Sequence, residues 1–156
     1  MTRVALAALF AVLYAGSAVA QGKPHPSCTV GGGGVAFGLF DPTSAANLDT
    51  TGTVTVDCDT SITVTLSLDL GNGAGAAYGT GRKMTTSGGG TLTYNLYANS
   101  TRTQVFGNGT GGNYTHDLSV RKNQTFSQPI WARIPKGQSG VLGGSYSDTV
   151  VATITY

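Results

Sequence analysis

The 156-residue sequence contains no glutamate, and charged residues make up only 10% of it. Soluble domains average about 25% charged residues, and surface helices depend on such residues on their solvated side. The shortage therefore argues against long surface helices. The formal net charge of +2 gives no reason to expect a nucleic-acid partner. Because 40% of the residues are hydrophobic, the low charge does not indicate a disordered chain.

Residue types that carry catalysis or bind metals are few and scattered. Only His25 and His116 occur, and neither has a second histidine or a cysteine at ligand spacing. The aspartates form no desolvated pair, a calcium loop lacks its closing glutamate, and no Gly-x-Ser-x-Gly motif is present. We therefore predict a structural domain that is not an enzyme and has no cofactor or metal. An enzyme or a sugar-binding domain would need a convergent polar cluster.

The first 20 residues have the pattern of a secretory signal peptide. Arg3 provides the positive charge, and residues 4–15 form an apolar run that is too short to span a membrane. Ala18-Val19-Ala20 fits a cleavage site. We predict a signal peptide over residues 1–20, a domain over residues 21–156 and an exported chain without a membrane span.

Two cysteines, Cys28 and Cys58, fall in the exported part. An even number of cysteines in an exported chain indicates a disulfide, whereas a zinc site would need further ligands such as histidine. A pair of free thiols is the other alternative. We predict a Cys28–Cys58 disulfide, which stabilises the fold by about 3–4 kcal/mol in the chain-entropy model.

Apolar and polar side chains alternate along most of the chain, which is typical of half-buried antiparallel strands. The strongest alternation covers residues 53–58, 62–70, 91–98 and 149–156, and weaker patterns cover residues 35–40, 103–106, 116–120 and 126–134. Pro129 implies an edge or a bulge. Turn signals lie at residues 31–34, 41–42, 72–73, 79–81, 88–90, 108–109 and 143–144. About seven strands at this spacing predict an all-β sandwich, with a small closed barrel as the alternative.

The last alternating segment has an unusual position. Val150, Ala152, Ile154 and Tyr156 share one apolar face, and no later strand follows them in this sequence. Such a strand either lies at a protected sheet edge or is completed by a strand from another chain.

Several short motifs occur in a specific order and spacing together with the two cysteines. They are Cys28-Thr29-Val30, Val35-Ala36-Phe37-Gly38, Phe40-Asp41-Pro42, and residues 52–58, 82–84, 92–97, 133–135, 144–150 and 153–156. This arrangement resembles the spore coat protein U domain family, which is shared with subunits of archaic chaperone–usher pili.

The resemblance implies an immunoglobulin-like sandwich that lacks its final strand. In such pilins a periplasmic chaperone first fills the resulting groove, and the N-terminal extension of a neighbouring subunit later replaces it. The tail strand forms one wall, which here corresponds to Val150, Ala152, Ile154 and Tyr156. The implied partners are the chaperone, an outer-membrane usher and a neighbouring pilin-like subunit. The implied location is the periplasm in transit, then the cell surface or the medium.

The sequence departs from shaft-forming pilins before the first cysteine. Such pilins carry a donor segment of about a dozen alternating residues there, as strand donation requires. Here residues 21–27 include Pro24 and Pro26, which lack backbone N–H groups. We therefore expect a secreted structural or adhesive subunit of a chaperone–usher surface assembly that accepts a strand without donating one, and hence a terminal position for it. The alternative is a secreted spore-coat or matrix protein that forms no fibre.

Overall fold

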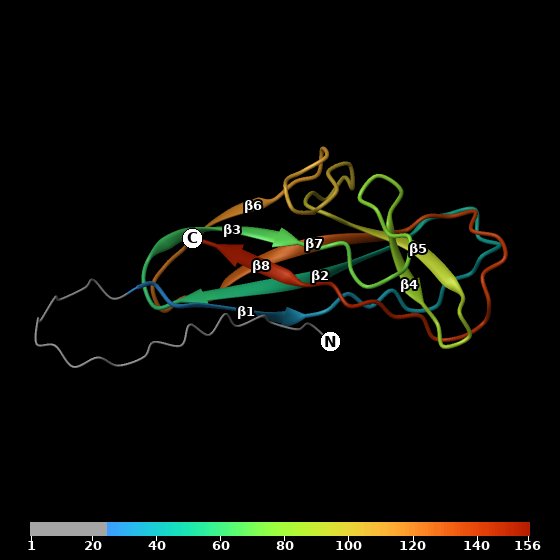
Figure 1. The fold of residues 1–156 in the computed structure, drawn as a ribbon, viewed down its shortest axis with the longest axis horizontal. Helices are drawn as coiled ribbons and strands as arrows, with labels where there is room; N and C mark the ends of the chain where they lie inside the picture. Colours follow the sequence, from blue (N-terminus) through green and yellow to red (C-terminus); the bar gives the residue numbers. More distant parts are fainter. Residues whose placement is uncertain (1–24) are drawn as a thin grey trace, which may run out of the picture.

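The computed structural model describes residues 25–156, so the predicted signal peptide lies outside the described residues. The described part consists of eight β-strands without a helix, and none of it could therefore cross a membrane as a helix. The strands form two sheets that pack against each other in an elongated sandwich (Figure 1). The predicted all-β sandwich is confirmed, with eight strands where about seven were expected.

Each sheet is fully antiparallel. The larger sheet contains, in spatial order, β1 (Cys28–Gly33), β2 (Leu48–Cys58), β7 (Phe126–Ile134), β5 (Thr91–Tyr97) and β4 (Arg82–Thr85). The smaller sheet contains β6 (His116–Val120), β3 (Ile62–Leu68) and β8 (Ala152–Thr155). The edges of the two sheets are therefore β1 and β4 in the larger one, and β6 and β8 in the smaller one.

The core follows from the two-residue alternation in the sequence. In β3, Val64, Leu66 and Leu68 are buried between the sheets, and the intervening polar side chains lie toward the solvent. The inner faces of β2, β5 and β7 contribute apolar side chains in the same way. Phe106, which belongs to no strand, is also fully buried.

The predicted disulfide joins Cys28 and Cys58. The two residues lie directly opposite each other in the β1–β2 register. The disulfide therefore links β1, an edge strand, to β2, which lies inside the larger sheet.

Three local predictions are wrong. Residues 31–33 belong to β1 and not to a turn, because β1 continues to pair with β2 through Gly33. Residues 35–40 are not a strand, although the Oγ1 of Thr50 donates a hydrogen bond to the carbonyl of Ala36 (3.1 Å). Residues 103–106 form only isolated bridges, since they follow a turn in which Arg102 has a φ of 56°.

The position of Pro129 agrees with the prediction of a local edge. β7 pairs with β2 along its whole length but with β5 only through residues 131–133. At Pro129 the strand therefore has β2 as its one neighbour, and the missing N–H group interrupts no pairing with β5.

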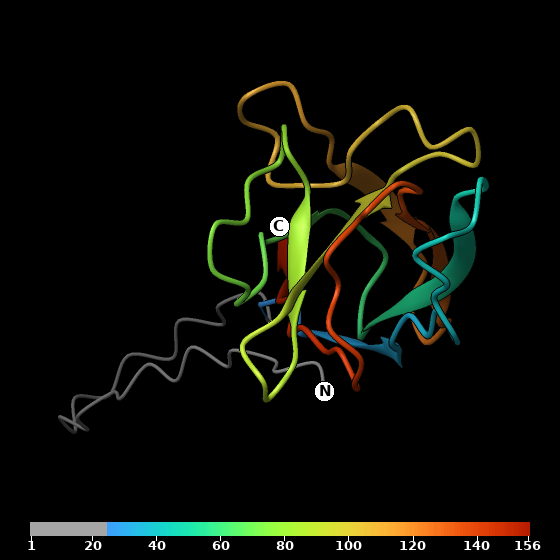
Figure 2. The same cartoon turned by 90° about the vertical axis from the view of Figure 1, so that its right-hand side faces the viewer.

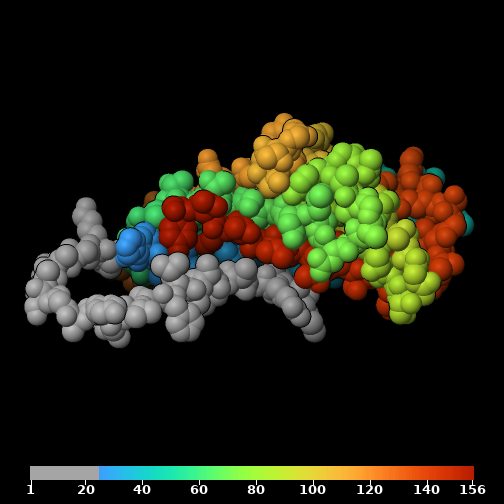
Figure 3. Space-filling view, viewed as in Figure 1, coloured from blue at the N-terminus to red at the C-terminus, as the bar shows by residue number. Residues whose placement is uncertain are grey.

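The final strand is shorter than the predicted range of residues 149–156, because the preceding chain crosses from one sheet to the other. Ser147 exchanges two backbone hydrogen bonds with Thr85 of β4 (2.9 and 3.0 Å). Four residues later, the carbonyl of Val151 accepts a hydrogen bond from the N–H of Asp69, just beyond β3 (3.0 Å). Only Ala152–Thr155 then pair with β3, and this C-terminal segment crosses one face of the molecule (Figure 3).

Candidate functional site: a groove between two free strand edges

Two free strand edges lie on the same side of the sandwich. β1 pairs only with β2, and β8 pairs only with β3. The two edge strands run in opposite directions, β1 toward the right and β8 toward the left of Figure 1. Each presents backbone groups that no described strand pairs.

A cavity of about 300 Å³ lies between these edges, and we call it the first cavity. Its walls come from the two edges and the chain next to them: Gly31, Gly32, Gly34, Val35 and Phe37 on one side, and Tyr146, Ser147, Asp148, Val150 and Ala152 on the other. Its floor is the sandwich interior, with Thr53, Val54, Leu68, Met84, Tyr94, Leu96 and Ile130. An object between the edges would therefore contact the hydrophobic core directly.

The cavity exists partly because the β1 residues that line it, Gly31 and Gly32, have no side chains. Gly32 has a φ of +134°, and a Cβ there would overlap the carbonyl oxygen of Thr53, so this position requires glycine. A Cβ on Gly34 would instead meet open space. The glycine run leaves backbone exposed where a side chain would otherwise fill the space beside Val35.

The two edges beside the cavity also lack the usual protection. Exposed edge strands in natural proteins are commonly guarded by charged residues against pairing with other chains. The opposite edges follow this rule, since β4 carries Lys83 and β6 carries Asp117. By contrast, the sequences CTVGGG of β1 and ATIT of β8 contain no charged residue. Among the edge strands of residues 25–156, the two beside the cavity are therefore the ones without a charged residue.

Of the four predicted wall residues, two line the first cavity and two do not. Val150 and Ala152 line the first cavity. Ile154 is half-buried against the core but does not line the cavity, and Tyr156 is 55% exposed. Tyr156 differs from the alternation because pairing with β3 ends at Thr155, one residue earlier. The role of all four residues in accepting a strand remains a prediction.

Asp148 anchors the crossing segment, and sequence analysis missed this role. Its carboxylate accepts a hydrogen bond from the hydroxyl of Tyr94 (2.7 Å) and from the backbone N–H groups of Asn72 and Thr149 (both 2.8 Å). Burial, and then the bond to Asp148, raise the pKa of Tyr94 above its ordinary range, so its hydroxyl remains a donor. Nearby, Asp69 accepts a hydrogen bond from the N–H of Val151 (2.8 Å).

A fully buried arginine supports the chain behind the cavity. The guanidinium of Arg82 donates hydrogen bonds to the carbonyl of Asp69 (3.0 and 2.7 Å), the carbonyl of Phe106 (2.7 Å) and the Oδ1 of Asn95 (2.9 Å). It also lies over the ring of Tyr78, 5.4 Å from the centroid. Burial lowers the pKa of Arg82, and the carbonyl acceptors compensate for lost hydration. Sequence analysis treated residues 82–84 only as a motif and gave no sign of this burial.

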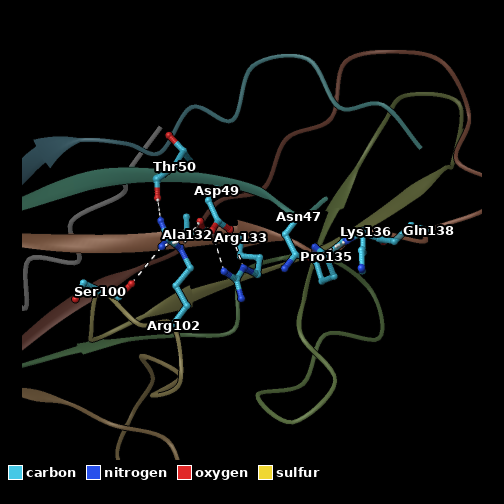
Figure 4. A network of polar contacts seen from close by, with 10 residues as sticks. All are labelled: Asn47, Asp49, Thr50, Ser100, Arg102, Ala132, Arg133, Pro135, Lys136 and Gln138. Carbon is cyan, nitrogen blue, oxygen red and sulfur yellow. Dashed lines mark hydrogen bonds and ion pairs between the residues drawn. The ribbon is translucent and has the colours of Figure 1, made fainter. Parts of the chain in front are cut away.

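The solvent face of the larger sheet has a separate polar network (Figure 4). Arg133 of β7 forms two hydrogen bonds with the carboxylate of Asp49 in β2 (2.7 and 2.8 Å). The hydrogen bond from Arg133 lowers the pKa of Asp49. Arg102 lies 3.5 Å from the same carboxylate and donates to the carbonyls of Thr50 and Ala132 (both 3.2 Å). The network ties β2 to β7 away from the cavity.

No described residues form a group of three or more His, Cys, Asp or Glu that could hold a metal ion. His116 packs edge-on against Phe106, and its Nε2 lies 3.0 Å from the carbonyl oxygen of Ala98. The first cavity, between the free edges of β1 and β8, is therefore the candidate site within residues 25–156.

Comparisons with known proteins agree with this architecture. No curated protein matches the chain. A solved structure, the CsuC–CsuE chaperone–tip adhesion subunit pre-assembly complex from archaic chaperone–usher Csu pili of Acinetobacter baumannii, is similar with a TM-score of 0.58 and 18% identity. The similarity covers 85% of this chain and 40% of that chain, and at this identity it shows a shared fold. A family model described as Spore Coat Protein U domain matches residues 15–153, and the chain belongs to this family.

Proposed function

We propose that the chain is a secreted structural subunit of a chaperone–usher surface assembly, and that its open sandwich accepts a β-strand from another protein. The observation that carries this proposal is the pair of uncharged free edges, β1 and β8, on either side of a cavity that reaches the core. An inserted strand would pair with both edges and cover the apolar floor. Since the edges run in opposite directions, it would be antiparallel to one and parallel to the other.

The proposed partners follow from the family and the similar structure. The similar structure is a complex of a chaperone with a tip adhesion subunit, from an archaic chaperone–usher pilus. By analogy, a periplasmic chaperone fills the groove before assembly, and a neighbouring subunit fills it after passage through an outer-membrane usher. The predicted signal peptide over residues 1–20, followed by a domain over residues 21–156, and the Cys28–Cys58 disulfide fit export to an oxidising compartment. The proposal assigns the chain no catalytic activity.

A fusion that supplies a strand tests the proposal. A donor of alternating apolar and polar residues is added after Tyr156 through a two-residue Asn-Gly turn, which returns the chain antiparallel to β8. We expect the melting temperature to rise by about 10 °C or more, because the donor covers exposed apolar surface and a free edge. The matched control has serine at every apolar donor position. An unfused chain that is monomeric and equally stable would contradict the proposal.

Within the assembly, we place the subunit at a terminal, adhesive position. Pro24 and Pro26 lack the N–H groups that a donor strand needs, and Lys23 and His25 are poor fillers of apolar pockets. The chain mixed with its chaperone and usher should therefore give no long homopolymer, and grafting a shaft pilin's N-terminal extension before Cys28 should restore polymerisation. Long fibres of the unmodified chain would exclude a terminal position.

A secreted spore-coat or matrix protein that forms no fibre is the second candidate, and the description of the family itself favours it. The two candidates differ in their need for a chaperone. Export of the chain in cells with and without a co-expressed chaperone and usher separates them, because a groove that must be filled in transit makes the yield depend on the chaperone.

A further inference from the structure

The solvent face of the larger sheet carries a cluster of charged and aromatic side chains, away from the groove. The cluster lies on β2, β7 and β5, the three inner strands of that sheet. In the end-on view of Figure 2, β2 (teal) and the C-terminal strand β8 (red) lie on different sides of the molecule. A strand inserted between β1 and β8 would therefore leave this face uncovered.

At the centre of the cluster, two arginines share one carboxylate (Figure 4). The Nη2 of Arg133 lies 2.8 Å from the Oδ2 of Asp49, and the Nη1 of Arg102 lies 3.5 Å from the same oxygen. Among residues 25–156, Asp49 is the one acid that forms an ion pair with either arginine. Both arginine side chains are partly buried, at 28% and 15% exposure, so solvent screens their charges incompletely. A second anion would balance the excess positive charge.

The two arginines differ in the donors that remain for such an anion. Arg102 donates to three backbone carbonyls and is therefore held against the sheet. Arg133 donates to Asp49 through its Nε and Nη2. A guanidinium has five N–H groups, so three of those on Arg133 have no acceptor within the described part of the chain. Asp49 thus fixes the orientation of Arg133 and leaves it able to bind a ligand.

Two aromatic side chains lie beside Arg133 on the same face. Trp131 precedes Arg133 by two positions in β7, so the two side chains project in the same direction about 7 Å apart. Tyr97 of β5 lies directly opposite Trp131 in the register. Both aromatic residues are only half-buried, although they belong to inner strands of the sheet. Their rings offer an apolar surface with polar edges, on which the C–H face of a sugar ring can stack.

Positive charge extends across the sheet from this point. Lys83 of β4 projects to the same face, because both of its neighbours in the strand are buried. From the register and the strand spacing, Lys83 lies about 12 Å from Arg133. The other acid on this face of β2 is Asp57, about 27 Å along the strand from Asp49. The surroundings of Trp131 and Arg133 therefore favour an anionic ligand.

We infer that the solvent face of β2, β7 and β5 binds an acidic saccharide, with a sugar ring on Trp131 and Tyr97 and its carboxylate at Arg133. Hydroxyl groups of the sugar find partners in Asp49 and in Thr51, which lies opposite Trp131 in the register. A single-stranded nucleic acid would instead need a basic groove that follows several phosphates. The inference does not depend on the strand-accepting groove.

Titration of the full chain with an oligomer of galacturonic acid tests the inference. Trp131 is the only tryptophan in the sequence, so its fluorescence reports on the proposed site directly. The methyl ester of the same oligomer is the matched neutral probe. We expect the acid to bind about tenfold more tightly than the ester, because only the acid presents a carboxylate to Arg133.

Substitutions locate this preference on the sheet face. Arg133→Gln should remove most of the preference for the acid, a change of about tenfold. Lys83→Gln leaves the Asp49 pair intact and should weaken binding of the acid about two- to threefold, so it tests the site even if Arg133→Gln fails to fold. Arg121→Gln is the matched control, because Arg121 is exposed and precedes the opposite end of β7. It should leave the preference unchanged.

Several results would overturn the inference. They are the absence of saturable binding, equal binding of the acid and the ester, a preference that survives Arg133→Gln, and a preference that falls as much in Arg121→Gln. Tighter binding of a thymidine oligonucleotide, with the same dependence on Arg133, would also overturn it and would identify a nucleic-acid face. The donor-strand fusion tests the proposed function separately from all of these results.

Discussion

Removing the Asp148 carboxylate should release the segment that forms the second wall of the groove. The carboxylate accepts three hydrogen bonds, from the hydroxyl of Tyr94 and from the N–H groups of Asn72 and Thr149. Tyr94 is buried, so Asp148→Ala leaves its hydroxyl without a partner, which costs about 1–3 kcal/mol. The two N–H groups can be hydrated more easily. We expect a total loss of about 2–4 kcal/mol in the free energy of unfolding.

Two further variants separate the hydrogen bonds from the charge. Asp148→Asn keeps one oxygen for both N–H groups, and its amide can donate to the Tyr94 oxygen, so the loss should be about 1 kcal/mol. Tyr94→Phe removes the hydroxyl together with its need for a partner, and should cost about 0.5–1.5 kcal/mol. The double variant Tyr94→Phe/Asp148→Ala should lose less than the sum of its single variants, because no unpaired hydroxyl remains buried.

Urea unfolding is the appropriate assay, and the fluorescence of Trp131, the only tryptophan in the sequence, reports on β7. An Asp148→Ala loss below about 0.5 kcal/mol would show that the carboxylate does not anchor the segment. Strict additivity in the Tyr94 and Asp148 cycle would show that the two side chains are not coupled, and would refute the geometry described above.

Three other predictions concern separate parts of the fold. Replacing both cysteines by serine should cost about 3–4 kcal/mol in the free energy of unfolding, and mass mapping of the unreduced protein should find one bridged peptide pair. Ile154→Asp should destabilise by about 2–4 kcal/mol and reduce export, whereas Thr155→Asp, on the exposed face of β8, should stay within about 0.5 kcal/mol; equal effects would contradict the register. Arg133 lowers the pKa of Asp49 in the folded state, so the Asp49–Arg133 pair stabilises the fold above the unfolded-state pKa of Asp49, which is near 4, and this stabilisation is lost as the pH falls through the folded-state pKa. Arg133→Met should remove up to about 1 kcal/mol of this acid-sensitive stability. A pH dependence of stability that is unchanged in Arg133→Met would contradict the pairing.

Alternation, strong or weak, predicted six of the eight strands, and it missed β1 and β4 although both pair within the chain. The patterns at residues 62–70, 91–98 and 126–134 correspond to β3, β5 and β7, because each of these strands has one face on the core. The glycine run at residues 31–34 was misread, since glycine favours both turns and close backbone approach. The sequence alone does not distinguish a turn from a close backbone approach here. The β1–β2 pairing does, because it places Gly32 against the backbone of Thr53.

The polar anchors were beyond sequence analysis for a different reason. Arg82 satisfies carbonyl groups of Asp69 and Phe106, which lie 13 and 24 positions away in the chain and belong to no strand. Neither the alternation nor any motif places these carbonyls near the guanidinium. Asp148 likewise bonds to Asn72 and Tyr94 only because the tail crosses between the sheets. Such contacts depend on tertiary structure and leave no local signature.

Two failed strand predictions gain a common explanation under the proposed function. Residues 35–40 and 149–151 have strand-like alternation, yet neither segment is a strand in the structure. Val35 and Phe37 nevertheless line the first cavity without Ala36, and Val150 lines it together with Ala152, so both pairs have the two-residue spacing of inward-facing strand residues. A strand needs a hydrogen-bonding neighbour as well as an apolar face. Both segments border the groove, so an inserted strand is the neighbour that their sequences are suited to pair with.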